Sequence, residues 1–185
     1  MHPVHSPQCC YRGQAGRFAE LTSETSPRAM NLHDYLIDQT GLDWPALLEE
    51  WRWLLPSEFS VWLLTRAGDL FITLPDGSIQ MLEVGSGELS RVADGRDDAC
   101  ARIDQPGVAE EWLMIPVVDE LVASGCVLGP GQCYSYKMLP ILGGSYAPEG
   151  RALLPIREHF GAWGSLHHQI ADLPDGAQIK VEVTG

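Results

Sequence analysis

Apolar residues recur at helical spacing in a short segment that follows residue 30. Leu32, Tyr35 and Leu36 share one face of a helix that starts at Asn31. Gly41 follows as a residue at which such a helix ends. The spacing therefore predicts a first amphipathic helix between Asn31 and Gly41.

A second helical segment begins at Asp43, whose side chain is a good N-cap, and Pro45 is tolerated in its first turn. Pro56 marks its end, because proline cannot continue a helix. The predicted apolar face consists of Leu47, Leu48, Trp51 and Leu55. The residues predicted to face solvent are Glu49, Glu50 and Arg52.

The pattern then changes to a period of two, which is typical of strands. Residues 59–65, 70–74 and 79–84 are rich in strand-forming residues, and the segments 67–69 and 75–78 between them are typical of turns. Three short strands with tight turns predict an antiparallel meander. One face of it is expected to pack against the helices.

The middle of the chain returns to helical patterns. Residues 87–104 are polar and charged, which predicts a helix or a loop at the surface. A further helix is expected over residues 109–124; Pro116 is a point at which it could break, and Gly125 supplies its end.

The last part of the chain combines strands with one regular helix. Short strands are predicted at 133–139, 152–154 and 178–183. A helix is predicted from Ile156 to Ile170, although two internal glycines lower its helix propensity. Its predicted face consists of Ile156, Phe160, Trp163, Leu166 and Ile170. The glycines are Gly161 and Gly164. Together these elements predict an α+β fold, an antiparallel meander with packed helices, in a single compact globular unit.

Residues 1–29 differ from the rest of the chain. They contain three arginines against two glutamates, two adjacent cysteines and three prolines, with no sustained periodicity. We expect either a disordered extension or a natural start at Met30.

Composition restricts the class of protein. The chain has 185 residues, of which 45% are hydrophobic and 20% charged, as in ordinary globular domains. Its five cysteines show no paired framework, and the N-terminus lacks the apolar core of a secretory signal. No apolar run approaches the roughly 18 residues of a membrane span. We therefore expect a cytoplasmic protein that does not bind membranes.

The chain is strongly acidic, with 12 basic against 25 acidic residues and a net charge of −13. Direct nucleic-acid binding is not expected, because such affinity comes mainly from lysine and arginine at phosphates. An acidic surface favours basic partners and faster association with them. It also favours solubility alone, and the charge by itself does not separate these two interpretations.

The residues that suggest chemistry have simpler structural interpretations. His167 and His168 are adjacent, so on a helix they cannot both face one metal ion; we expect one to be buried and hydrogen-bonded and the other exposed. Cys133 falls in a predicted strand, which favours a core residue over a nucleophile paired with a histidine. No metal and no cofactor are expected.

Glycine-rich segments in the chain lack the spacing of known phosphate loops and of the serine-hydrolase turn. We expect their glycines to serve the backbone, through positive φ angles or close approach of two segments. The segments are 85–87, 129–131 and 143–144.

Two features suit a protein partner. Pairs of adjacent carboxylates are expected on solvated faces, where they could meet a basic partner. Among six tryptophans, Trp51 and Trp53 point to different sides of their helix, so at least one is expected to be partly exposed. The candidate partner-binding residues are Glu49, Glu50, Trp53, Asp97, Asp98, Glu110 and Glu111.

The last third of the chain supplies a family resemblance. GPGQCYSYKMLPILGGSYAPEGR, followed by LPIREHFGAWGSLHHQIADLPDGAQIKVEV, resembles the C-terminal domain of type VI secretion immunity proteins, which often follows a GAD-like N-terminal half. One departure is that Gly150 follows Glu149, where the family pattern has asparagine.

The resemblance implies a GAD-like half over residues 30–104 and the immunity-protein C-terminal half over 105–185. It further implies a non-enzymatic cytoplasmic protein that binds and silences a cognate effector. With the acidity, it suggests a basic nuclease toxin whose active site or substrate groove is covered.

Two alternatives stay open from the sequence. The first is a small-ligand-binding or regulatory module whose pocket is lined by Cys133, Tyr134, Tyr136, Gly143, Gly144 and Tyr146. The second is an enzyme that uses Cys133 with His159 or His167. A cysteine and a histidine within hydrogen-bond reach in a cleft would identify the enzyme.

Overall fold

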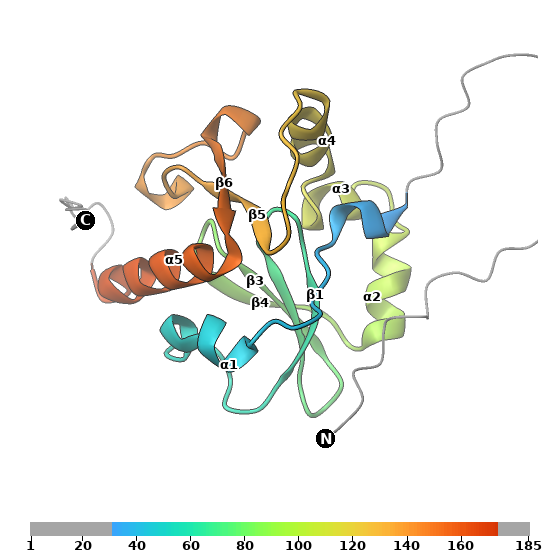
Figure 1. Ribbon diagram of the computed structural model, residues 1–185. Helices are drawn as coiled ribbons and strands as arrows, with labels where there is room; N and C mark the ends of the chain where they lie inside the picture. Colours follow the sequence, from blue (N-terminus) through green and yellow to red (C-terminus); the bar gives the residue numbers. More distant parts are fainter. Residues whose placement is uncertain (1–30, 174–185) are drawn as a thin grey trace, which may run out of the picture. The chain divides into compact units, whose positions relative to one another are not determined.

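An antiparallel sheet of four strands forms the centre of the computed structural model, which describes residues 31–173 (Figure 1). The strands follow one another in the order β1-β2-β3-β4. Their bounds are Ser60–Leu64, Leu70–Thr73, Ile79–Glu83 and Glu88–Ala93. The described residues from Leu32 onward belong to one compact unit. The α+β fold and the three predicted strands of the meander are confirmed.

The fourth strand, β4, falls in a segment for which the sequence predicted a helix or loop. Only its last residue, Ala93, is buried, and Glu88 and Arg91 are exposed. As an edge strand it carries the charged side chains that protect a sheet edge, and these hide the apolar alternation. Most of the remaining segment forms the helix α2, which is one of the two structures expected there.

Both faces of the sheet carry apolar clusters because the strand register places alternate residues on opposite sides. A bulge lies between Val61 and Leu63 in the pairing of β1 with β2. It allows Trp62 and Leu63, consecutive residues, to join the same cluster with Phe71, while Leu64 joins the other.

Helices cover both faces, as Figure 1 shows. On one face lie α1 (Trp44–Leu47), the 3-10 turn η2 (Glu49–Trp51) and α5 (Ile156–Ile170), packed on the cluster that contains Leu64 and Phe160. On the other lie α2 (Arg96–Ile103) and α3 (Val108–Trp112). Ala99 and Trp112 belong to the cluster there. The sheet is therefore the middle layer of three.

The remaining elements form a third group beside the sheet. A hairpin of β5 (Gln132–Tyr136) and β6 (Arg151–Pro155) packs against α5 and α4 (Ile115–Ala123). Three 3-10 turns complete the described fold: η1 (Leu32–Tyr35), η3 (Pro140–Leu142) and η4 (Pro148–Gly150). The predicted strand at 178–183 and the segment 1–29 lie outside the described residues.

The first predicted helix is wrong beyond one turn. After η1, Leu36 bridges to Thr65, and the N–H of Ile37 donates to the carbonyl of Leu64. The backbone groups of Leu36 and Ile37 therefore extend the sheet at the edge of β1 instead of continuing a helix. Residues 64 and 65 of the sheet edge supply their hydrogen-bond partners.

The predicted apolar face of the second helix is correct, but the segment is not one continuous helix. Leu47, Leu48, Trp51 and Leu55 are all buried, and the Asp43 carboxylate caps the helix through the N–H of Ala46 at 3.4 Å. The chain tightens into the 3-10 turn η2 after Leu48. In the later helical segment, the break falls at Met114, which has a φ of 49°, and Pro116 lies in the first turn of α4.

The helix α5 has the predicted bounds. Its buried side includes Ile156 and Phe160 as expected, and also His159, Gly164 and His167. Leu166 and Ile170 are only partly buried. Gly164 lies directly against the indole of Trp51: a Cβ at this position would be 2.7 Å from Trp51 Nε1. The glycine that weakens the helix in isolation therefore allows η2 to approach it.

Candidate partner-binding surfaces

A buried histidine joins α5 to the meander. His159 is fully buried, with Nε2 3.2 Å from the carbonyl oxygen of Gly68 and Nδ1 2.8 Å from Ser135 Oγ. Because a carbonyl only accepts, Nε2 carries the proton and Nδ1 accepts from Ser135. The indole of Trp163 donates to the same hydroxyl at 2.9 Å. Burial lowers the pKa of His159 to about 4, so the ring is neutral at pH 7.

A buried arginine joins the β5–β6 hairpin to α4. The Arg151 guanidinium donates to the carbonyl of Tyr134 at 3.2 Å and to the hydroxyl of Tyr136 at 3.1 Å. It also lies 2.8 Å from the sulfur of Met114 and 3.8 Å from the Tyr136 ring centroid. These partners make the arginine part of the structural framework.

A buried carboxylate, Asp69, stands at the end of the sheet. It accepts from the N–H of Val84 at 2.9 Å. Burial raises its pKa to about 6, although the Val84 hydrogen bond and the charge of Arg151 act in the opposite direction. The carbonyl of Val84 in turn accepts from His167 Nε2 at 2.9 Å. The sequence did not single out Asp69 or Arg151, because neither belongs to a recognisable motif.

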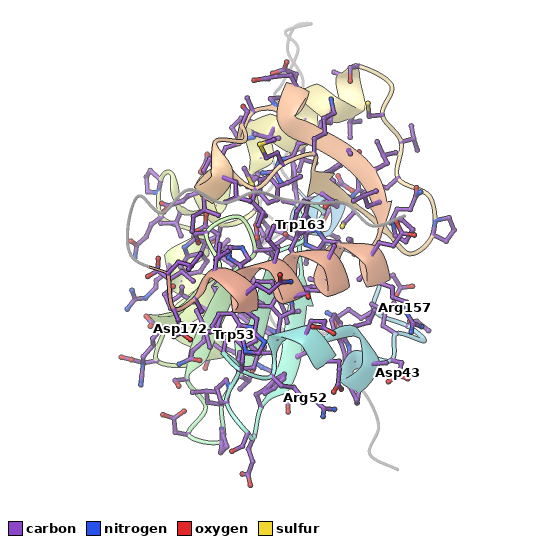
Figure 2. All side chains as sticks on the ribbon, turned by 90° about the vertical axis from the view of Figure 1, so that its left-hand side faces the viewer. Asp43, Arg52, Trp53, Arg157, Trp163 and Asp172 are labelled. Carbon is purple, nitrogen blue, oxygen red and sulfur yellow. The ribbon has the colours of Figure 1, made fainter. Side chains whose placement is uncertain are left out.

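The first exposed surface lies along η2 and α5, and it contains Glu49, Glu50, Trp53 and His168; we call it the aromatic surface. The Trp53 indole, 36% exposed, stacks on the His168 ring at 5.3 Å between centroids and on Trp51 at 6.4 Å. Figure 2 shows Trp53 and Asp172 near the same end of α5, with Asp43 and Arg157 toward the other end. The expectations that at least one of Trp51 and Trp53 is partly exposed, and that one of the adjacent histidines is buried and the other exposed, are confirmed.

Charge on the aromatic surface is partly compensated. Glu49 forms an ion pair with Arg52 at 2.7 Å, and both side chains are more than half exposed. Such exposed pairs contribute little to stability. They do reduce the net negative field that a basic partner would meet.

The second exposed surface lies on α3, α4 and the end of α2; we call it the acidic surface. It consists of the exposed residues Asp104, Glu110, Glu111, Asp119 and Glu120. No lysine, arginine or histidine occurs between Arg102 and Lys137 in the sequence. In the part of the chain that the structure describes, none of the five forms an ion pair. Asp119 accepts a hydrogen bond from Tyr35 Oη at 2.8 Å.

The seven sequence-predicted residues are therefore divided between two faces of the sheet. Glu49, Glu50 and Trp53 lie on the face covered by α5. Glu110 and Glu111 belong to the acidic surface on the other side. Asp97 and Asp98 also lie on that side, on α2, where Asp98 forms an ion pair with Arg102 at 3.0 Å.

Three residues of the suggested ligand pocket fill the interior, whereas Gly143 and Tyr146 are exposed. Cys133, Tyr134 and Tyr136 are at most 1% exposed. Gly143 has a φ of 88°, and Gly144 packs against the backbone of Met138, as expected for glycines that serve the backbone. A shallow hollow elsewhere is lined by Glu58, Phe59, Ser60, Thr73, Leu74, Pro75 and Arg96.

The suggested thiol–histidine pair is not assembled. Burial raises the pKa of Cys133 to about 12, which keeps the thiol protonated. The hydrogen-bond partners of His159 are Ser135 and Gly68, and that of His167 is Val84. Among the described residues, no group of three metal-ligating side chains comes together. No helix in this part of the chain is long and apolar enough to cross a membrane.

Comparison with known families gives one match. Residues 94–167 match the family described as T6SS immunity protein Tdi1, C-terminal. The matched segment runs from the end of β4 through α2, α3, α4 and the hairpin to His167 on α5. It therefore includes the acidic surface and excludes Glu49, Glu50 and Trp53. No curated protein matches the chain.

The match covers less than half of the chain, and within it residues 94–167 are similar to the C-terminal domain of a type VI secretion immunity protein family. The GAD-like character of residues 30–104 and the boundary before residue 105 remain predictions. The matched segment begins at residue 94, and its buried histidines bind carbonyls of Gly68 and Val84, outside it.

Proposed function

We propose that this protein neutralises a cognate type VI effector whose toxic domain is a basic nuclease, by covering its active site or substrate groove with the acidic surface. The acidic surface itself is the observation that carries this proposal. Five exposed carboxylates gather on α3, α4 and the end of α2, in a stretch of sequence without a single cation. The effector would act in the cytoplasm, where the immunity protein is proposed to reside.

The physical argument concerns charge complementarity. A nuclease holds its substrate through lysine and arginine side chains at the phosphates. An acidic surface attracts that basic groove over about 10 Å at 0.1 M salt, accelerates the encounter and repels the nucleic-acid substrate. Asp98 contributes less to this field because Arg102 forms an ion pair with it.

The test is a binding titration between the full chain and the toxic domain encoded by the neighbouring gene, at low and high salt. We expect nanomolar affinity and an association rate that falls as salt rises. Glu110→Lys with Glu111→Lys should lower the association rate about tenfold at low salt. Protection of plasmid DNA from the toxin gives the matching functional readout.

The matched control is Glu49→Lys with Glu50→Lys, an equal charge change on the aromatic surface. It should leave the association rate within about twofold of wild type, apart from a salt-screened effect of net charge. The reverse ranking of the two variants would assign the interface to the aromatic surface with Trp53. No binding of wild type to a folded, active toxin would contradict the proposed function for that pair.

A further inference from the structure

The connection between β5 and β6 is much longer than a hairpin needs. It covers residues 137–150, whereas hairpin loops usually contain two to five residues. The strands around it pair regularly, from Gln132 opposite Pro155 to Tyr136 opposite Arg151. We call this segment the β5–β6 loop. Long loops within compact domains commonly serve a function.

The β5–β6 loop is built as a fixed structure. Its two ends are tied by a hydrogen bond from the N–H of Lys137 to the carbonyl of Gly150 at 2.8 Å. Leu139 is fully buried beneath it, and the N–H of Gly144 donates to the Leu139 carbonyl at 3.0 Å. The Lys137 ammonium donates to the carbonyl of Glu149 at 2.7 Å. Close ends and internal packing are the features of a compact Ω-loop.

Two glycines allow this folding. A Cβ on Gly144 would collide with the backbone of Met138 and Leu139, and one on Gly150 would collide with the backbone of Ser145. The departure from the family pattern at position 150 is thus a place where the loop closes on itself. Ser145 Oγ also donates to Glu149 at 2.9 Å and accepts from the N–H of Ala147 at 3.1 Å.

This fixed loop points apolar side chains at solvent. Met138, Ile141 and Tyr146 are 52%, 54% and 43% exposed. They are three of the seven large hydrophobic residues that are exposed in the described part of the chain. Tyr146 is held in place, because its hydroxyl donates to Glu83 at 3.2 Å and its ring meets Tyr136 edge-on. Ordered apolar side chains without a cover mark interaction sites.

The β5–β6 loop reaches the acidic surface at one end. Its last turn, η4, packs against α4, which carries Asp119 and Glu120. Figure 1 shows the hairpin connection and α4 at the same end of the described unit. An apolar centre beside charged residues is the arrangement of protein–protein interfaces.

From this contact we infer that the β5–β6 loop is the apolar anchor of the effector interface, and that the effector offers a hydrophobic hollow bordered by basic residues. The inference rests on the proposed function. A second copy of this chain is the less suitable occupant, since a symmetric contact through the loop would bring two acidic surfaces together.

The anchor and the acidic surface should affect different rate constants. Charged residues at the edge of an interface set the association rate, whereas packed apolar anchors set the dissociation rate. Met138→Ser with Ile141→Ser should therefore raise the dissociation rate from the toxic domain about 30-fold and leave the association rate unchanged. Both side chains are more than half exposed, so thermal stability should stay close to wild type.

The experiment measures both rate constants by surface plasmon resonance with the full chain and the toxic domain encoded by the neighbouring gene. Leu173→Ser is the control, because Leu173 is 46% exposed and lies beyond the end of α5. It should bind as wild type. Wild-type kinetics in the loop variant would overturn the inference while leaving the proposed function intact, whereas failure of wild type to bind would overturn both. Sedimentation showing wild-type dimers that the loop variant abolishes would assign the loop to a second copy and also overturn the inference.

Discussion

The Nε2 nitrogen of His159 lies 3.2 Å from the carbonyl oxygen of Gly68, 91 residues earlier in the chain. Gly68 has a φ of 97°, and a side chain there would collide with the imidazole. The His159 ring occupies the space that a side chain at position 68 would need, so this packing requires glycine there. This contact fixes α5 of the family domain to the turn between β1 and β2.

Replacing His159 with alanine should lower the free energy of unfolding by about 3 kcal/mol, because it opens a cavity and leaves buried polar partners unpaired. Urea denaturation of the full chain measures this. His168→Ala is the matched control, since His168 is exposed and loses only its stack on Trp53, which costs about 1 kcal/mol or less. Similar losses in the two variants would contradict a special role for the buried ring.

The contribution of His159 to stability should fall as the pH drops from 6.5 to 4, because the folded state resists protonation of this residue. Its pKa is 6.5 in the unfolded reference and about 4 in the fold, so over this range the unfolded chain binds the extra proton. The corresponding loss is about 3 kcal/mol by linkage. Urea titrations at several pH values measure the slope.

Asp69 acts in the opposite direction within nearly the same range. Its pKa rises from 3.8 to about 6, so between these values the folded state binds the extra proton and is favoured as the pH falls. Asp69→Asn removes this opposing contribution and should steepen the acid loss between pH 6 and pH 4. A slope equal to or shallower than that of wild type would show that Asp69 does not titrate as proposed.

Two glycines of α5 should respond oppositely to alanine. A Cβ on Gly161 would meet open space, so Gly161→Ala should raise stability by about 0.5 to 1 kcal/mol through helix propensity. At Gly164 the Cβ would lie 2.7 Å from Trp51 Nε1 and 2.9 Å from Glu50 Cβ. Gly164→Ala should therefore lower stability by about 2 kcal/mol through overpacking. Thermal unfolding of both variants measures these changes in stability. A change in the same direction for both variants would contradict the packing of η2 on α5.

The thiol of Cys133 should resist alkylation in the folded protein. It is fully buried, and burial raises its pKa to about 12, so little thiolate forms at pH 8. Cys126 is partly exposed and should react with iodoacetamide much faster, as judged by peptide mass spectrometry. Rapid modification of Cys133 under native conditions would reopen the interpretation of this residue as a nucleophile.

Local chemistry explains which elements the sequence predicted well. The turns at 67–69 and 75–78, and the residues that alternate around them, depend on near neighbours, so the first three strands were predicted with small errors at the ends. The edge strand β4 was missed because its exposed charges obscure the alternation. The first helix was wrong because partners on β1 compete for the backbone groups of Leu36 and Ile37.

For the candidate surfaces too, the sequence predicted local features but not the contacts between distant residues. Sequence alone identified the carboxylate pairs and Trp53, since composition and helical spacing predict exposure. It did not indicate that Glu49 pairs with Arg52, or that Glu49 and Glu110 lie on opposite faces of one sheet. Nor did it indicate that Asp119 and Glu120 belong with Glu110, because that grouping depends on the packing of α3 against α4.

Residue order, spacing and composition were sufficient for the α+β class, the meander, the bounds of α5, the acidity and the resemblance to the immunity family. The contacts of individual side chains required the folded chain. Folding places His159 on Gly68, encloses Arg151 among Tyr134, Tyr136 and Met114, and shapes residues 137–150 into an exposed apolar loop beside the acidic surface. Such contacts join residues that are far apart in the chain, and local sequence patterns do not determine how close these residues lie in the folded protein.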